Sequence, residues 1–178
     1  MEEYMESYLR KSLVISIILL ILGLSLLFSE DKSRVITPVA LGEMGERVFV
    51  TKVIDGDTIE IEGGQKVRLV GIDTPETVDP RRPVGCFGKE ASNEVKKLLS
   101  GKGIIMQKDI SDTDKYGRLL RYVYLPLESG QMLFINDYLV REGFARVYTY
   151  PPDVKFNEQF VEADREAREN QRGLWKSC

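Results

Sequence analysis

The sequence contains no histidine and only two cysteines. The absence of histidine excludes histidine-dependent nucleases, phospholipases and triad hydrolases, and it argues against a zinc site, because zinc is usually held by histidine and cysteine. The cysteines, Cys86 and Cys178, lie too far apart in the chain to form a close metal-binding pair. They either form a disulfide, as is common in exported domains, or remain free thiols.

A strong excess of charge of one sign is also absent. The chain carries 25 basic and 28 acidic residues, of which 4 and 6 precede Gly45, so the remaining part is nearly neutral. Nucleic-acid-binding proteins usually present a basic face. The charge balance therefore gives no independent support for nucleic-acid binding, although a bound divalent cation would add positive charge that the count omits.

One long apolar run, residues 13–28, has no polar face. As a helix it would span about 24 Å, less than the roughly 30 Å hydrocarbon core of a bilayer, which is typical of a signal peptide or a minimal anchor. Small residues suited to signal peptidase are poorly placed at its end, which favours an uncleaved anchor. We expect a signal anchor or signal peptide at 1–29, a tether at 30–45 and a domain at 46–178, either anchored outside the cell membrane or secreted.

A β-hairpin with acidic residues at both ends is predicted by the segment VIDGDTIEIEGGQKVRLVGIDTPE. Residues 58–62 alternate apolar with polar, two glycines signal a turn, and residues 67–72 restart the alternation. Antiparallel pairing would bring Asp57, at the start of one strand, close to Asp73, just past the end of the next. Arg68 faces the opposite side from its apolar neighbours, so it could reach the acidic end.

The acids and the arginine of this hairpin suit a hard cation and a phosphate. Calcium and magnesium take oxygen ligands, and two aspartates with a backbone carbonyl are an ordinary site for them. Alternatively, Asp-Gly-Asp and Thr-Pro are only turns in which acids make local hydrogen bonds. The coincidence of Asp57, Asp73 and Glu76 with Arg68 favours the functional interpretation.

Periodicity predicts the elements that complete the domain. Further strands are expected at 47–54, 104–109 and 119–125, helices at 88–101, 134–142 and 156–171, an extended segment at 144–150 and a loop at 77–87. Five strands with a helix after the third is the order of an oligonucleotide-binding (OB) barrel. We predict an α+β fold that is mainly β: a five-stranded OB-fold barrel with three helices, preceded by an N-terminal hydrophobic helix.

Five motifs in a fixed order, between about residues 48 and 175, resemble those of the thermonuclease (staphylococcal nuclease) family. They are VIDGDT, VRLVGIDTPE, FGKEAS, DKYGR and the closing GLW. The resemblance implies a calcium-dependent nuclease that hydrolyses DNA and RNA to products ending in 3′-phosphate.

The resemblance also assigns roles to individual residues. The residues that would bind calcium, the last through its main-chain carbonyl, are Asp57, Asp73 and Thr74. The residues that would act on the scissile phosphate and the attacking water are Arg68, Arg118 and Glu76. The residues that would contact the bound nucleotide are Lys115, Tyr116, Tyr148 and Tyr150. The match of the last two tyrosines is approximate, and their shared strand face fits base stacking or plain core packing.

A second interpretation is a non-catalytic OB-fold module that binds nucleic acid or protein, because such folds host many functions. The retained acids and arginines favour the enzyme. We expect a monomer that acts on DNA and RNA substrates and that contacts the membrane through residues 13–28 if this segment is not cleaved.

Overall fold

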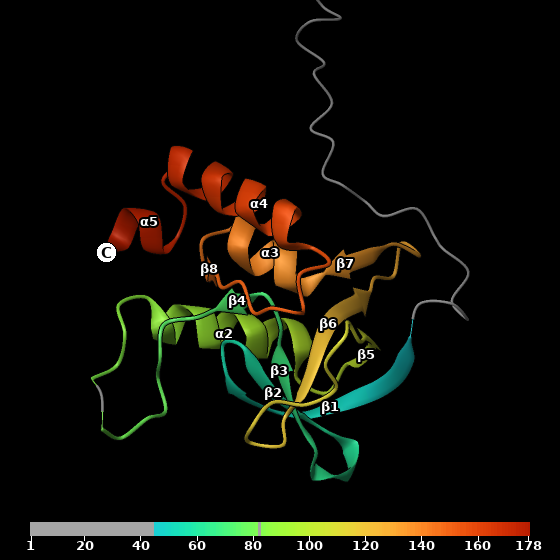
Figure 1. Ribbon diagram of the computed structural model, residues 1–178. Helices are drawn as coiled ribbons and strands as arrows, with labels where there is room; N and C mark the ends of the chain where they lie inside the picture. The colour runs from blue at the N-terminus through green and yellow to red at the C-terminus, as the bar shows by residue number, and fades with distance from the viewer. Residues whose placement is uncertain (1–44, 82) are drawn as a thin grey trace, which may run out of the picture. The chain divides into compact units, whose positions relative to one another are not determined.

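The computed structural model of the protein describes residues 45–81 and 83–178 (Figure 1). Five strands in this part of the chain close into a barrel. They are β1 (Glu46–Asp55), β2 (Thr58–Ile61), β3 (Lys66–Leu69), β5 (Gly103–Gln107) and β6 (Leu119–Pro126). Antiparallel pairs give the order β3-β2-β1-β5-β6, and a parallel pairing between β3 and β6 closes the ring. This topology confirms the predicted OB-fold.

Alternating burial along the strands explains why they close around one core. In β1, Val48 and Val50 are buried while Phe49 between them is exposed, as a strand with one face inward requires. Ile59 of β2 and Val67 of β3 are completely buried and lie opposite each other. Each such side chain stabilises the fold by about 1.5–3 kcal/mol.

The predicted hairpin is present. Thr58 of β2 pairs with Arg68 of β3, and the turn between the strands is a short 3₁₀ segment, Glu62–Gly64. Gly63 and Gly64 have φ angles of 83° and 78°, a region that favours glycine. This register leaves Arg68 on the face opposite the buried core.

The strand expected at residues 67–72 is interrupted. The chain turns at Gly71, whose φ is 81° and where an added Cβ would lie 2.5 Å from the ring of Phe160. Beyond this glycine, a separate strand, β4 (Ile72–Asp73), pairs with β8 (Arg146–Val147). A further short strand, β7 (Met132–Phe134), pairs with β6, so the helix expected from residue 134 begins one residue later.

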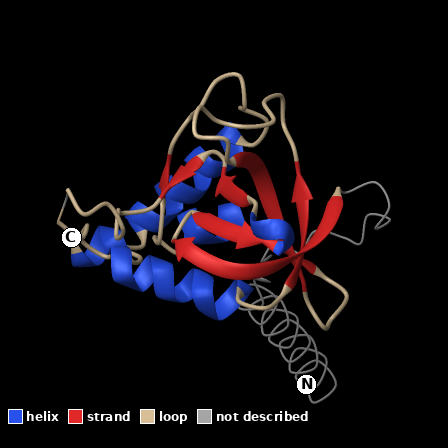
Figure 2. Ribbon diagram, turned by 90° about the horizontal axis from the view of Figure 1, so that it is seen from below, coloured by secondary structure: helices blue, strands red, loops and turns tan. Residues whose placement is uncertain are grey.

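The three predicted helices are present as α2 (Gly88–Leu99), α3 (Ile135–Arg141) and α4 (Asn157–Glu169). Buried Ala91, Val95 and Leu99 recur every fourth residue of α2, which packs this face against β1. Helix α4 packs on α3, and a further short helix, α5 (Leu174–Ser177), follows it. Figure 2 shows the curved strands of the barrel in red and the helices in blue.

A disulfide joins Cys86 to Cys178 across a sequence separation of 92 residues, which is one of the two alternatives that the sequence left open. It ties the loop between β4 and α2 to the end of α5. None of the helices within residues 45–81 and 83–178 is long and apolar enough to cross a membrane. The apolar run predicted to be a signal or anchor, residues 13–28, and the tether before Gly45 lie outside the described residues.

Candidate active site

The hairpin and β4 bring the two predicted aspartates to one arginine. The Arg68 guanidinium lies 3.0 Å from a carboxylate oxygen of Asp57 and 2.9 Å from one of Asp73. Thr74 donates hydrogen bonds from its main-chain N–H and its hydroxyl to the same Asp57 oxygen, Oδ2, both at 3.0 Å. The four residues therefore form one cluster, although Asp57 and Thr74 lie 17 positions apart in the chain.

The second predicted arginine reaches this cluster from a turn before β6. Asp114 Oδ2 accepts a hydrogen bond from Arg118 Nε at 2.7 Å and forms an ion pair with Nη2 of the same guanidinium, also at 2.7 Å. Asp114 Oδ1 accepts a further hydrogen bond from the main-chain N–H of Arg118. The free end of the guanidinium lies 3.4 Å from the hydroxyl of Thr58, the residue that pairs with Arg68 across the hairpin. Both guanidiniums thus line the same hollow.

Glu76 is held by the chain that follows it. One carboxylate oxygen, Oε1, accepts hydrogen bonds from the main-chain N–H groups of Thr77, Val78 and Asp79, at 3.0, 2.8 and 3.1 Å. The bond from Val78 is the largest contribution that lowers the pKa of Glu76. A carboxylate held in this way is ionised at neutral pH.

A further carboxylate that the sequence interpretation did not assign lies behind this group. Asp55, only 6% exposed, accepts hydrogen bonds from the Gly56 N–H and, at 2.6 Å, from the Thr77 hydroxyl. Burial raises the pKa of Asp55, although the bond from Thr77 opposes this. The sequence signal that could have identified Asp55 is its position two residues before Asp57, at the end of a strand with alternating apolar and polar residues.

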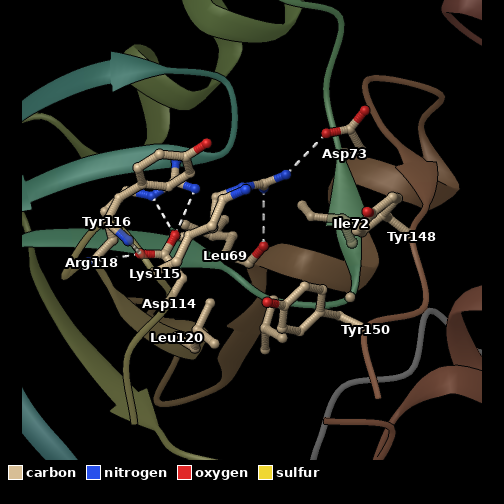
Figure 3. A pocket seen from close by; sticks show the side chains of 13 residues that line it. Leu69, Ile72, Asp73, Asp114, Lys115, Tyr116, Arg118, Leu120, Tyr148 and Tyr150 are labelled. Carbon is tan, nitrogen blue, oxygen red and sulfur yellow. Dashed lines mark hydrogen bonds and ion pairs between the residues drawn. The ribbon is translucent and has the colours of Figure 1, made fainter. Parts of the chain in front are cut away.

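Two adjoining hollows open over these residues. The first, of about 490 Å³, is lined by Asp57, Asp73, Glu76 and both arginines, and is here called the central cleft. The second, of about 360 Å³, shares Arg68, Asp73 and Arg118 with the first and is here called the tyrosine pocket (Figure 3).

Three tyrosines line the tyrosine pocket from opposite sides. Figure 3 shows Tyr116 beside Lys115 and Arg118, across the pocket from Tyr148 and Tyr150. Tyr148 and Tyr150 are 53% and 40% exposed and their rings stack at 6.4 Å, which excludes the core-packing alternative. Tyr116 is 72% exposed, with the Lys115 ammonium 5.0 Å from its ring centre. Exposed aromatic faces beside cationic groups suit nucleotides.

Comparison with known proteins agrees with this geometry. The family model described as "Staphylococcal nuclease homologue" matches residues 66–177. The chain belongs to the staphylococcal nuclease family. A thermonuclease of Staphylococcus intermedius is 45% identical over 135 residues, which are 74% of this chain and 77% of that protein. A thermonuclease of Staphylococcus hyicus is 35% identical over 168 residues, 92% of this chain and 96% of its own.

Endonuclease YncB of Bacillus subtilis (strain 168) is 39% identical over 133 residues, which cover 72% of this chain and 61% of the relative. These relatives and the family match show that the protein is a nuclease and therefore a hydrolase. The recognition of the family from its five motifs is confirmed.

The residues predicted to hold calcium in this nuclease offer only oxygen. Asp57 and Asp73 supply carboxylates and Thr74 a main-chain carbonyl, which is the donor type that calcium prefers. Within residues 45–81 and 83–178 there is no group of three or more acidic, histidine or cysteine side chains arranged to hold a metal. This finding is compatible with the predicted calcium ligands, because only two of them, Asp57 and Asp73, bind through an acidic side chain. The oxygen donors fit a hard cation.

Proposed function

We propose that this nuclease is calcium dependent and hydrolyses the phosphodiester bonds of DNA and RNA to products ending in 3′-phosphate. The observation that supports this most strongly is the convergence of two arginines and an ionised glutamate on one cleft that also contains paired aspartates. Oxygen ligands, phosphate-binding groups and a group able to orient water are the parts that phosphodiester hydrolysis needs.

Calcium would be held by Asp57, Asp73 and the carbonyl of Thr74. Bound there, the ion supplies Lewis-acid polarisation of a phosphoryl oxygen. The hydrogen bonds from Thr74 keep Asp57 in place, so the two ligands are positioned together before any substrate arrives.

Arg68 and Arg118 are proposed to bind the scissile phosphate. A guanidinium donates paired hydrogen bonds to phosphate oxygens and stabilises the negative charge that grows on them in the transition state. Arg68 is already fixed by Asp57 and Asp73, and Arg118 by Asp114, so neither has to be ordered when the substrate binds.

Glu76 is proposed to accept a hydrogen bond from the attacking water and to aim it at the phosphorus. Its main-chain hydrogen bonds fix the carboxylate and keep it ionised, which this role requires. Lys115 and Tyr116 would contact a neighbouring phosphate, and Tyr148 and Tyr150 would stack on a base.

We further propose that the nuclease domain acts outside the cytoplasm as a monomer, secreted or held to the membrane by residues 13–28. The Cys86–Cys178 disulfide supports this location, because such bonds persist mainly in oxidising compartments.

The test is hydrolysis of single-stranded DNA and of RNA by the purified full-length protein, in calcium and then in excess chelator, beside a Glu76→Gln variant. We expect cleavage that requires both calcium and Glu76 and leaves 3′-phosphate ends. Cleavage that survives chelation would contradict the metal role, and cleavage by the variant would contradict the role of Glu76. Folded protein that neither cleaves nor binds calcium would instead indicate a non-catalytic OB-fold binding module.

A further inference from the structure

A third hollow, of about 320 Å³, lies along α2 and the loop that follows Glu76. It is here called the α2 groove and is lined on the helix side by Lys89, Ser92, Asn93 and Lys96. These positions are spaced at three and four residues, so they share one face of the helix. The opposite wall includes the exposed side chains of Val78 and Val84.

The α2 groove continues the central cleft. The two hollows share Ile54 and Val78, whereas the α2 groove shares no residue with the tyrosine pocket. The three hollows therefore follow one another in the order tyrosine pocket, central cleft, α2 groove. A strand whose scissile phosphate lies in the central cleft and whose base lies at Tyr148 and Tyr150 would leave along α2.

The charge of the α2 groove differs from that of the central cleft. None of the eight residues that line it in the described part of the chain is acidic, and two are lysines. Glu94 of the same helix accepts a hydrogen bond from the Tyr138 hydroxyl at 2.9 Å and pairs with Lys97 at 3.4 Å, so it is engaged elsewhere. Among the residues that the structure describes, neither Lys89 nor Lys96 has an ion-pair partner within 4.0 Å.

We propose that the α2 groove binds the phosphodiester backbone of the substrate strand beyond the scissile phosphate, on the side away from the tyrosine pocket. This inference rests on the proposed function, because it places the scissile phosphate in the central cleft. Lysine binds phosphate as a point charge without regard to sequence, and serine and asparagine donate hydrogen bonds to phosphate oxygens. Among the described residues, no aromatic side chain lines the groove, so it would hold backbone there and would not select a base.

The test compares the full-length protein with a Lys89→Gln/Lys96→Gln variant on two substrates, a dinucleotide and a single-stranded dodecanucleotide. The matched control is Lys97→Gln/Lys102→Gln, which removes the same charge from exposed positions outside the groove. We expect the ratio of kcat/KM for the long over the short substrate to fall by about 3- to 10-fold in the groove variant only. The plot of log(kcat/KM) for the dodecanucleotide against log salt should become shallower by about 1.4, the slope of two phosphate contacts on a single strand.

A Lys89→Arg/Lys96→Arg variant should keep the wild-type ratio, because it keeps both charges. Single substitutions of each exposed lysine are measured beside the pair, so that a folding defect of the double variant does not hide the effect. A ratio and a salt slope equal to those of the control would overturn the proposal. An equal loss on both substrates would also overturn it, because it would place the effect in the central cleft.

Binding of a labelled dodecanucleotide, followed by fluorescence anisotropy in chelator, separates this proposal from the proposed function. The wild-type protein could fail to cleave, while the groove variant, unlike the control, binds the strand more weakly than the wild type. This result would contradict the proposed function and support the proposal for the groove. If the protein cleaves the substrate but neither binding nor the ratio of kcat/KM depends on the two lysines, the proposal for the groove is contradicted and the proposed function is supported.

Discussion

Arg68 and Asp73 lie on paired strands, whereas Glu76 lies at the start of a segment, residues 74–81 and 83–87, that contains no helix or strand. On the strand side, the positions of the functional groups follow from sheet register: Arg68 lies opposite Thr58, and Asp73 opposite Arg146. Ladder hydrogen bonds on both sides of β3 hold this half of the site, because β3 pairs with β2 and with β6.

The loop side is held by individual contacts. The two ends of the loop approach each other through Gly85, whose N–H donates to the Glu76 carbonyl at 2.8 Å. A Cβ on Gly85 would lie 2.7 Å from the side chain of Pro75, so any other residue would force the loop to shift. Next to it, Cys86 is bonded to Cys178, which ties the loop to the end of the chain.

Because the strand side and the loop side are held by different contacts, we expect that a mutation can disrupt one side of the site without the other. Changes on the strand side should act on the binding of phosphate or of calcium with the loop intact. Changes at the base of the loop should displace Glu76 and leave calcium binding as it is. Arg68→Ala, removal of the disulfide and Gly85→Ala test this separation, and Asp114→Asn tests the turn that carries the second arginine.

The largest effect is expected for Arg68→Ala. Cleavage should fall by about 10²–10³-fold, because a fixed donor to transition-state charge contributes that much. Calcium binding should be unchanged or tighter, because a positive charge 2.9–3.0 Å from two of the proposed ligands is removed. Hydrolysis assays and calorimetric titration measure the two quantities, with Arg81→Ala, at an exposed loop arginine, as the control. Weaker calcium binding by the folded variant would contradict this account of Arg68.

Removal of the disulfide by Cys86→Ser/Cys178→Ser should lower the free energy of unfolding by about 2–5 kcal/mol. It should also reduce kcat several-fold through displacement of Glu76, without changing calcium affinity. Denaturant unfolding and steady-state kinetics check both expectations. Reductant should have the same effect on the wild-type protein and none on the variant, and a change in calcium affinity would show that the two halves are not separate.

Gly85→Ala should cost about 1–3 kcal/mol through overpacking against Pro75. Because the added Cβ would also lie 3.2 Å from the main-chain nitrogen of Glu76, kcat should fall more than stability alone explains. Gly103→Ala is the control, since its Cβ would come no closer than 3.4 Å to any neighbour, the Phe49 ring. Unfolding and turnover are compared for the two variants, and equal kcat values would show that the loop absorbs the methyl group without moving Glu76.

The smallest effect is expected for Asp114→Asn, in the turn that carries Arg118. Burial of Asp114 opposes ionisation, but the hydrogen bonds from Arg118 and Tyr116 outweigh it and lower the pKa of the carboxyl. Its stabilising contribution is therefore present above the unfolded aspartate pKa, about 3.9, and is lost as the pH falls through the lower folded pKa. We expect a loss of about 1 kcal/mol at neutral pH.

Urea unfolding at neutral and at acidic pH tests the Asp114 prediction. The difference between Asp114→Asn and the wild-type protein should disappear once the pH lies below the folded pKa of the wild-type carboxyl. A difference that persists there would mean that the ionised form of Asp114 does not stabilise the turn.

The sequence by itself determined the barrel, the hairpin and the face on which Arg68 lies. Period-two alternation and a pair of glycines are local signals, and side-chain parity along a strand follows from them without knowledge of the remaining chain. The family motifs added the identity of the enzyme, and they named the residues that the structure gathers around the central cleft.

Only the tertiary structure decided the details that depend on distant segments. At the break, the close approach of Gly71 involves the ring of Phe160, which lies almost ninety positions away in the chain. Buried Asp55 accepts a hydrogen bond from the distant Thr77, and the exposed Tyr148 and Tyr150 follow β8, which pairs with β4. The α2 groove likewise adjoins the central cleft only because one face of α2 packs near the end of β1. Such contacts are set by packing between elements, which the local pattern of apolar and polar residues does not encode.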